Sequence, residues 1–178
     1  MFIASGGILE LYTVPNFKGL VAACDSLRPR FGEWSFREDR MGIATNCKTV
    51  PFYWLENFKL PDIDLVEKFD GIPPEVATAI KDLEDYYGGF VCKAMLVTLK
   101  AGGDIPRHTD IGIDFEESHR CHIPIYCNDD CIFYAKDKWY SLTEGVAYEL
   151  SNLDEHEVLN LGVEERLHLV IDISKKGI

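Results

Sequence analysis

The sequence predicts a mainly β fold of the α+β class, with a sandwich or jelly roll in the second half of the chain. After residue 90, six short segments are rich in β-branched and aromatic residues, and Gly, Asp or Asn separates them. No helix-length segment interrupts them, so the crossovers of a parallel α/β sheet are not expected. Many short antiparallel strands favour a jelly roll. The expected strands are residues 90–99, 119–127, 131–135, 145–150, 156–161 and 166–173.

Two helices are expected before residue 90, where they would brace one sheet from outside. The clearer one is PPEVATAIKDLEDYYGG, residues 73–89, because prolines open it, apolar residues recur at helical spacing and glycines end it. A weaker helical pattern, FKGLVAACDSL, covers residues 17–27. We therefore expect a single domain over residues 1–178, in which a helical and irregular flank, residues 1–90, braces a β core over residues 91–174.

Composition excludes several classes of protein. Apolar residues make up 47% of the 178 residues, which is enough for a sizeable core and argues against disorder. The net charge of −12, without a basic stripe, argues against a nucleic-acid partner. The opening residues lack the pattern of a signal peptide, and no apolar run approaches the roughly 18 residues of a membrane helix. We expect a soluble, cytoplasmic protein with no membrane partner.

Six cysteines occur, and a cytosolic protein usually keeps its cysteines reduced. Cys127 and Cys131 are too far from any second close pair to form a zinc knuckle. Free cysteine is often buried, so small core residues are the expected reading. The cysteines are Cys24, Cys47, Cys92, Cys121, Cys127 and Cys131.

The strand-rich half contains all five histidines of the chain. Within PRHTD, His108 and Asp110 point to the same side if the segment is extended, because side chains in a strand alternate. His156 begins a strand 48 residues after His108. Two imidazoles and one carboxylate match the site of non-haem Fe(II) oxygenases, which leaves coordination positions open for O₂ and an organic co-substrate. The alternative for H-x-D is a polar turn in which Asp110 caps backbone amides.

Arg166 opens the last predicted strand, RLHLVIDI. A buried guanidinium without a partner is costly, so an arginine at this place suggests a bound anion. A dicarboxylate co-substrate would supply one bidentately. The alternative is a surface arginine paired with Glu164 or Glu165.

The segment HRCHIPI suggests a second anion-binding pair. Strand alternation places Arg120 and His122 on one face and Cys121 and Ile123 on the other. His119 falls on the face opposite His122, and we expect it to be exposed on the surface. Solvent-facing positions for both Arg120 and His119 are the alternative.

Taken together, LVTLKAGGDIPRHTD…HRCHIPI…WYSLTEGVAYELSNLDEHEVLNLGVEERLHLVID resembles the aspartyl/asparaginyl β-hydroxylase family over roughly residues 90–173. The ordered motifs are a glycine turn, H-x-D, R-x-H-x-P, a Trp before a turn glycine, H-x-V-x-N and R-x-H-L-V. The resemblance implies a double-stranded β-helix and an Fe(II)- and 2-oxoglutarate-dependent dioxygenase. Such an enzyme uses O₂ to hydroxylate a C–H bond and converts 2-oxoglutarate to succinate and CO₂.

The resemblance also implies roles for individual residues. His108, Asp110 and His156 would ligate Fe(II), and Arg166 would bind the distal carboxylate of 2-oxoglutarate. Arg120 and His122 would hold carboxylate oxygens near the metal. Asn160 would fix a turn or the barrel rim rather than touch substrate, and His168 would either line the pocket or be a hydrogen-bonded core histidine.

The substrate implied is an amino acid, a peptide or a related small molecule. Some peptide-hydroxylating members lack the carboxylate of H-x-D, whereas this chain keeps Asp110, which places it nearer to branches acting on small molecules. The aromatic residues of the first half and Trp139 could wall a pocket or belong to the core. Those of the first half are Trp34, Tyr53 and Trp54.

Two other functions stay open on the sequence alone. The first is a cupin-type metalloprotein that does not use 2-oxoglutarate, with His122 as a third imidazole ligand beside His108 and His156. The second is a catalytically silent binding domain that keeps the barrel for partner recognition.

Overall fold

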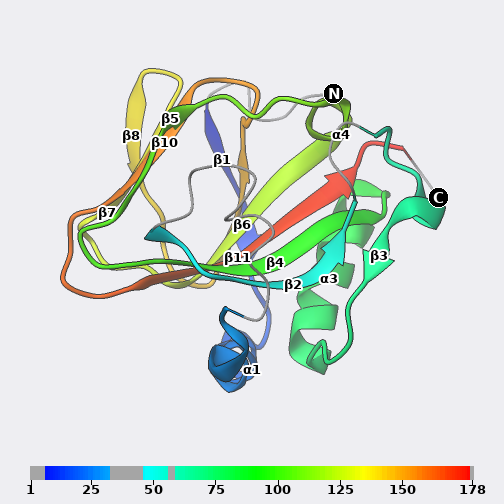
Figure 1. The fold of residues 1–178 in the computed structure, drawn as a ribbon, viewed down its shortest axis with the longest axis horizontal. Coiled ribbons are helices and arrows are strands. Elements are labelled where there is room, and N and C mark those ends of the chain that lie inside the picture. Colours follow the sequence, from blue (N-terminus) through cyan, green and yellow to red (C-terminus); the bar gives the residue numbers. More distant parts are fainter. Residues whose placement is uncertain (1–6, 33–45, 56–58, 177–178) are drawn as a thin grey trace.

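Two antiparallel sheets form the centre of the computed structural model, which describes residues 7–32, 46–55 and 59–176. The strands are β1 (Ile8–Thr13), β2 (Thr49–Trp54), β3 (Glu67–Lys68), β4 (Val91–Leu99), β5 (Asp104–His108), β6 (Ser118–Tyr126), β7 (Cys131–Ala135), β8 (Lys138–Ser141), β9 (Val146–Leu150), β10 (His156–Asn160) and β11 (Arg166–Ser174). The large sheet has the order β1-β9-β6-β11-β4-β2-β3, and the small sheet has the order β5-β10-β7-β8. The expected mainly β jelly roll is confirmed (Figure 1).

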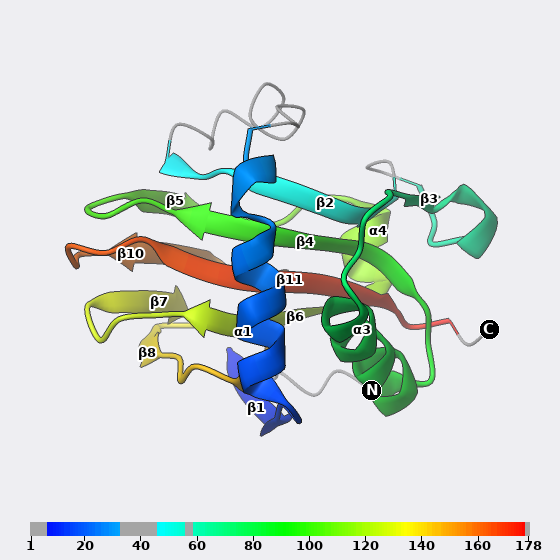
Figure 2. The same cartoon turned by 90° about the horizontal axis from the view of Figure 1, so that it is seen from below.

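Helices α1 (Phe17–Ser26) and α3 (Pro74–Tyr87) cover one face of the large sheet (Figures 1 and 2). Pro74 occupies the first turn of α3, where its missing N–H costs nothing, and Gly88 ends the helix with a φ of +68°. Both helices were expected from their sequence patterns. The remaining helical segments are η1 (Arg28–Arg30), η3 (Ile63–Leu65) and α4 (Ile113–Glu116).

Strand β11 separates the helix-facing core from the space between the two sheets, and all nine of its residues are buried. Successive side chains of a strand point to opposite faces. Alternate residues of β11 therefore pack in the core beneath the helices, namely Leu167, Leu169, Ile171 and Ile173. The intervening residues face the small sheet, namely Arg166, His168, Val170 and Asp172.

Strand β6 shows the same alternation, as expected from HRCHIPI. Cys121 and Ile123 lie in the helix-facing core, whereas Arg120 and His122 line the space between the sheets. The expectation that His119 is exposed was wrong, because the side of β6 that carries it is covered by α3. His119 is only 8% exposed, and the ring of Tyr87 stacks on it at a centroid distance of 4.1 Å.

The first 90 residues contribute strands as well as helices. β1 pairs with β9, and β2 pairs with β4, so both extend the large sheet, where we had expected a helical and irregular flank. The pattern of β1 is weak because most of its positions are only half-buried, and Pro51 within β2 is unusual for a strand. Strand β8 was also not expected, since it is short and mostly exposed.

The six cysteines are all free, and Cys24, Cys92, Cys121 and Cys131 are buried. Cys47 and Cys127 are partly exposed. The core position expected for the cysteines thus holds for four of them. None of the helices in the described ranges is both long and apolar enough to cross a membrane.

Candidate functional site

His108, at the end of β5, and His156, at the start of β10, are direct cross-strand partners. Their ring centroids lie 4.2 Å apart. Asp110 follows β5, and its backbone N–H donates to the carbonyl of Asn152 at 3.0 Å. Nε2 of His108 lies 3.8 Å from Oδ1 of Asp110, and Nε2 of His156 lies 4.0 Å from Oδ2. The register between β5 and β10 brings the two histidines together, and the turn after β5 places Asp110 beside them.

Both imidazoles are oriented for metal binding through Nε2. Nδ1 of His108 lies 2.7 Å from the carbonyl oxygen of Pro106, and Nδ1 of His156 lies 3.0 Å from that of Asp154. A carbonyl oxygen only accepts hydrogen bonds, so each Nδ1 carries a proton, and the neutral form of either ring has its lone pair on Nε2. Burial lowers the pKa of His156, although Asp110 opposes the shift, and the ring is therefore neutral at pH 7.

The three candidate ligand atoms lie within 4.8 Å of one another. Nitrogen and carboxylate ligands bind first-row metal ions at about 2.0–2.2 Å, so two ligands of one ion lie at most about 4.4 Å apart. The distances of 3.8 Å and 4.0 Å from the two imidazoles to Asp110 meet this limit. Two neutral imidazoles and one carboxylate are suited to Fe(II). The donor set thus fits the expected metal. Among the described residues His122 is outside this cluster, which counts against the three-imidazole alternative.

Arg120 is bound by two buried carboxylates. Its Nη1 donates to Oδ2 of Asp110 at 2.5 Å, while Nε and Nη2 donate to the two oxygens of Asp172 at 2.8 Å each. Burial alone would lower the pKa of Arg120, but Asp110 and Asp172 raise it above its ordinary value. Arg120 is therefore a permanent cation held against the candidate metal ligand.

A cavity lies between the two sheets, with His108 and His156 among its lining residues. The large sheet contributes Val97, Arg120, His122, Leu150, Arg166 and Val170, and the small sheet adds Ile105, Phe133 and Val158. Six of the eleven lining residues are apolar, and the five histidines and arginines converge from the two sheets. Such a surface is typical of a pocket for a small organic ligand.

Arg166 lines this cavity and is only 1% exposed. Within the described residues, its Nε and Nη1 have no hydrogen-bond partner. The surface alternative is wrong, because Arg166 is buried and Glu165 instead pairs with Arg28 at 3.1 Å. The ring of Phe133 lies beside Arg166, with its centroid 5.4 Å from Cζ. Two unpaired N–H donors on a buried cation are expected to bind an anion.

His168 is completely buried two residues after Arg166. Its ring stacks on Phe133, and its Nδ1 lies 3.3 Å from Nδ1 of His122. Burial, Arg166 and His122 lower its pKa well below the usual value, so the ring is neutral. Its Nε2 has no partner among the described residues.

Asn160 fixes a turn, as expected, and is fully buried. Its Nδ2 donates to the carbonyls of Leu99, Lys100 and Glu164. Three of the aromatic residues considered for the pocket are described, and they do not line the cavity: Trp54 packs in a small core cluster, Tyr53 packs against the main core, and Trp139 is 48% exposed. Trp34 lies outside the described residues.

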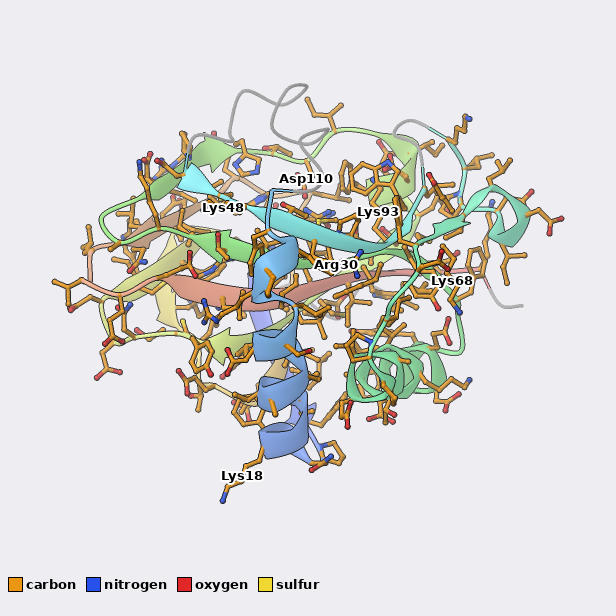
Figure 3. All side chains as sticks on the ribbon, turned by 60° about the horizontal axis from the view of Figure 1, so that its bottom comes forward. Lys18, Arg30, Lys48, Lys68, Lys93 and Asp110 are labelled. Carbon is orange, nitrogen blue, oxygen red and sulfur yellow. The ribbon has the colours of Figure 1, made fainter. Side chains whose placement is uncertain are left out.

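Three charged residues beside the site were not expected from the sequence. Asp172 binds Arg120, and the buried Lys93 contacts Asp114 (Lys93 and Asp110 are labelled in Figure 3). The available signal was a charge within an otherwise apolar strand, since Lys93 interrupts FVCKAML and Asp172 interrupts HLVIDI. Such residues are almost never fully buried unless they are paired.

A jelly roll whose cavity is lined by two histidines, with the carboxylate of Asp110 clustered beside them, has the donor set of the non-haem Fe(II) oxygenase class. A family model described as Aspartyl/Asparaginyl beta-hydroxylase matches residues 44–176, and the chain belongs to this family. A search of curated proteins finds no match.

Several solved structures have a similar fold. One is an oxidoreductase of the 2OG-Fe(II) oxygenase family from Burkholderia pseudomallei, with a TM-score of 0.65 and 14% sequence identity. The match covers 97% of this chain and 86% of that chain. A prolyl-4-hydroxylase from Pseudomonas putida has TM-score 0.64, 12% identity and coverage of 98% and 96%. A viral collagen prolyl hydroxylase of Paramecium bursaria Chlorella virus-1, solved as a 2OG complex, has TM-score 0.62, 9% identity and coverage of 97% and 98%. These likenesses extend the shared fold across both halves of the chain.

Proposed function

We propose that this protein is an Fe(II)- and 2-oxoglutarate-dependent dioxygenase that hydroxylates a C–H bond. The observation that carries the proposal is that one cavity is lined by the candidate metal ligands His108 and His156 and by the buried Arg166. Nε and Nη1 of Arg166 have no hydrogen-bond partner among the described residues. A dicarboxylate that reaches from the metal cluster to Arg166 would bind the metal at one end and accept hydrogen bonds from the guanidinium at the other. Membership of the aspartyl/asparaginyl beta-hydroxylase family supports the same activity.

His108, Asp110 and His156 would hold the iron. Bound Fe(II) and 2-oxoglutarate supply the oxidising chemistry, in which O₂ is consumed and the co-substrate becomes succinate and CO₂. The carbonyls of Pro106 and Asp154 keep the two imidazoles in the tautomer that offers Nε2, and they fix the ring orientations. The part of the chain that the structure describes thereby presents three preorganised ligands, which leaves positions for the reactants.

Arg166 would bind the distal carboxylate of 2-oxoglutarate, and its fork of N–H donors suits that geometry. His122 also lines this cavity, where it would contact the co-substrate. The apolar side chains of Val97, Val158 and Val170 would exclude water around it. Exclusion of water strengthens the electrostatic interactions of the bound ligand and orders the reactants.

An amino acid, a peptide or a related small molecule would be the substrate. The presence of Asp110 among the ligands supports the small-molecule end of this range, and a screen would begin with free amino acids.

Turnover of 2-oxoglutarate tests the proposal. The purified protein would be incubated with Fe(II), 2-oxoglutarate, O₂ and pooled amino acids, and succinate would be measured by NMR. We expect succinate from the wild-type chain and none from Asp110→Ala, because the carboxylate ligand is lost. Arg107→Ala is the matched control, since Arg107 is a nearby surface residue paired with Glu157. Unchanged turnover in Asp110→Ala would refute the assigned site.

A further inference from the structure

We propose that Asp172 is a positioning residue for the metal centre, which acts through Arg120 on Asp110. This inference rests on the proposed function, because it concerns the orientation of a metal ligand. Asp172 itself lies outside the candidate ligand cluster among the described residues. Its contribution would be to fix the cation that contacts the ligand.

The contact between Asp172 and Arg120 is a two-pronged ion pair. Both oxygens of Asp172 accept hydrogen bonds, from Nε and Nη2 of Arg120, at 2.8 Å each. The two residues are direct cross-strand partners on β11 and β6, and they are 2% and 8% exposed. The guanidinium also lies over the ring of Phe115, with Cζ 4.7 Å from its centroid. A parallel pair of hydrogen bonds fixes both the position and the plane of a guanidinium.

With its plane fixed, Arg120 directs Nη1 at Oδ2 of Asp110. This hydrogen bond limits rotation of the Asp110 carboxylate, whose other oxygen faces His108. A metal site gains affinity when hydrogen-bonded neighbours hold its ligands in place before the ion arrives. Asp172 is therefore expected to raise metal affinity although it does not touch the ion.

The geometry separates this role from the one that the family resemblance implies for Arg120. A co-substrate ligand would keep its donors for 2-oxoglutarate, whereas the structure directs three donor atoms of Arg120 to Asp110 and Asp172. The two roles predict different defects. Loss of a positioning residue weakens metal binding without any co-substrate, and loss of a co-substrate ligand weakens 2-oxoglutarate binding at saturating metal.

Calorimetric titration of the metal-free, full-length protein with Mn(II), in the absence of 2-oxoglutarate, tests the inference. We expect Asp172→Asn, which keeps the side-chain shape, to bind Mn(II) about 10- to 100-fold more weakly than wild type. Arg120→Lys keeps the charge but loses the fork, and we expect a loss of similar size. Circular dichroism and thermal unfolding report whether each variant is folded, and Arg120→Lys serves as the test if Asp172→Asn does not fold.

Glu149→Gln is the matched control, because Glu149 is also a buried carboxylate in the large sheet. It contacts His119 and Tyr87 beneath α3 and not the metal cluster, so its Mn(II) affinity should equal that of wild type. Wild-type Mn(II) affinity in folded Asp172→Asn would overturn the inference, as would a defect confined to 2-oxoglutarate binding. A wild-type chain that binds no divalent metal would instead overturn the proposed function, and the inference with it.

Discussion

Arg166 and His168 lie on the same face of β11 and share one aromatic neighbour, Phe133. The Phe133 ring stacks on His168 with an interplanar angle of 13°, and its centroid lies 5.4 Å from Cζ of Arg166. Burial is the main cause that lowers the pKa of His168, and the adjacent charge of Arg166 adds to it. One residue of the pair is thus cationic and the other neutral. The end of the cavity at Arg166 therefore presents a fixed positive charge beside a ring that resists protonation.

Acidification is expected to destabilise the metal-free protein. The unfolded chain binds a proton on His168 at its ordinary pKa of 6.5, whereas the folded protein keeps the ring neutral well below that value. The unfolded state then binds more protons, so the free energy of unfolding falls below about pH 6.5, by up to about 1.4 kcal/mol per pH unit for this group. Above that pH the contribution is fully present.

Urea unfolding at about pH 7.5 and about pH 5.5 measures this effect. His168→Asn removes the titrating ring and should reduce the pH dependence, although His156, whose pKa is also lowered, retains part of it. An equal pH dependence in wild type and His168→Asn would contradict the assignment of His168 as a buried neutral histidine.

Removal of the Arg166 side chain is expected to weaken the binding of 2-oxoglutarate but not the binding of the metal. A hydrogen bond to a charged group contributes about 1.5–3 kcal/mol, so Arg166→Ala should bind 2-oxoglutarate at least about 10-fold more weakly. Affinity for Mn(II) alone should not change, because Arg166 is outside the ligand cluster. Anaerobic calorimetry with the Mn(II)-loaded protein checks both values. Equal 2-oxoglutarate affinity in variant and wild type would contradict the pocket assignment.

The helix-facing side of β11 should matter for stability and not for metal binding. Leu169 is fully buried in the core beneath α1 and α3. We expect Leu169→Ala to lower the free energy of unfolding by about 2–5 kcal/mol, through lost burial and the cavity that remains. Mn(II) affinity of the folded variant should equal that of wild type. A loss of metal affinity without destabilisation would show that the two faces of the strand do not act separately.

The buried pair Lys93 and Asp114 should also be structural. Both side chains are at most 2% exposed, and Nζ of Lys93 lies 4.2 Å from the ring centroid of Phe115. Asp114→Asn would leave the Lys93 ammonium without its carboxylate, which is expected to cost about 3–5 kcal/mol. The double variant Lys93→Met, Asp114→Asn should be more stable than Asp114→Asn alone. Urea unfolding measures the stability of both variants. A double variant less stable than Asp114→Asn would show that other groups compensate the charge of Lys93.

Strand patterns predicted most of the jelly roll because β4, β6 and β11 are buried on both faces and therefore read as long apolar segments. Strands β1 and β2 were not predicted, because β1 is only half-buried and β2 contains a proline.

The site was predictable to a similar degree. Alternation placed His108 and Asp110 together, whereas the pairing of His108 with His156 depends on the register between β5 and β10. The ion pair from Arg120 to Asp172 could not be expected, because the two residues are 52 positions apart and meet only when β6 pairs with β11. Spacing along one strand is visible in a sequence, but register between strands is a property of the fold.

Anaerobic titration of the metal-free protein with Fe(II) and then with 2-oxoglutarate, followed by visible absorbance, tests the central claim most directly. The proposed site predicts a weak charge-transfer band that appears only when both are present. Iron binding without that band would contradict the use of 2-oxoglutarate and favour a cupin-type metalloprotein, and no iron binding would favour a silent binding domain.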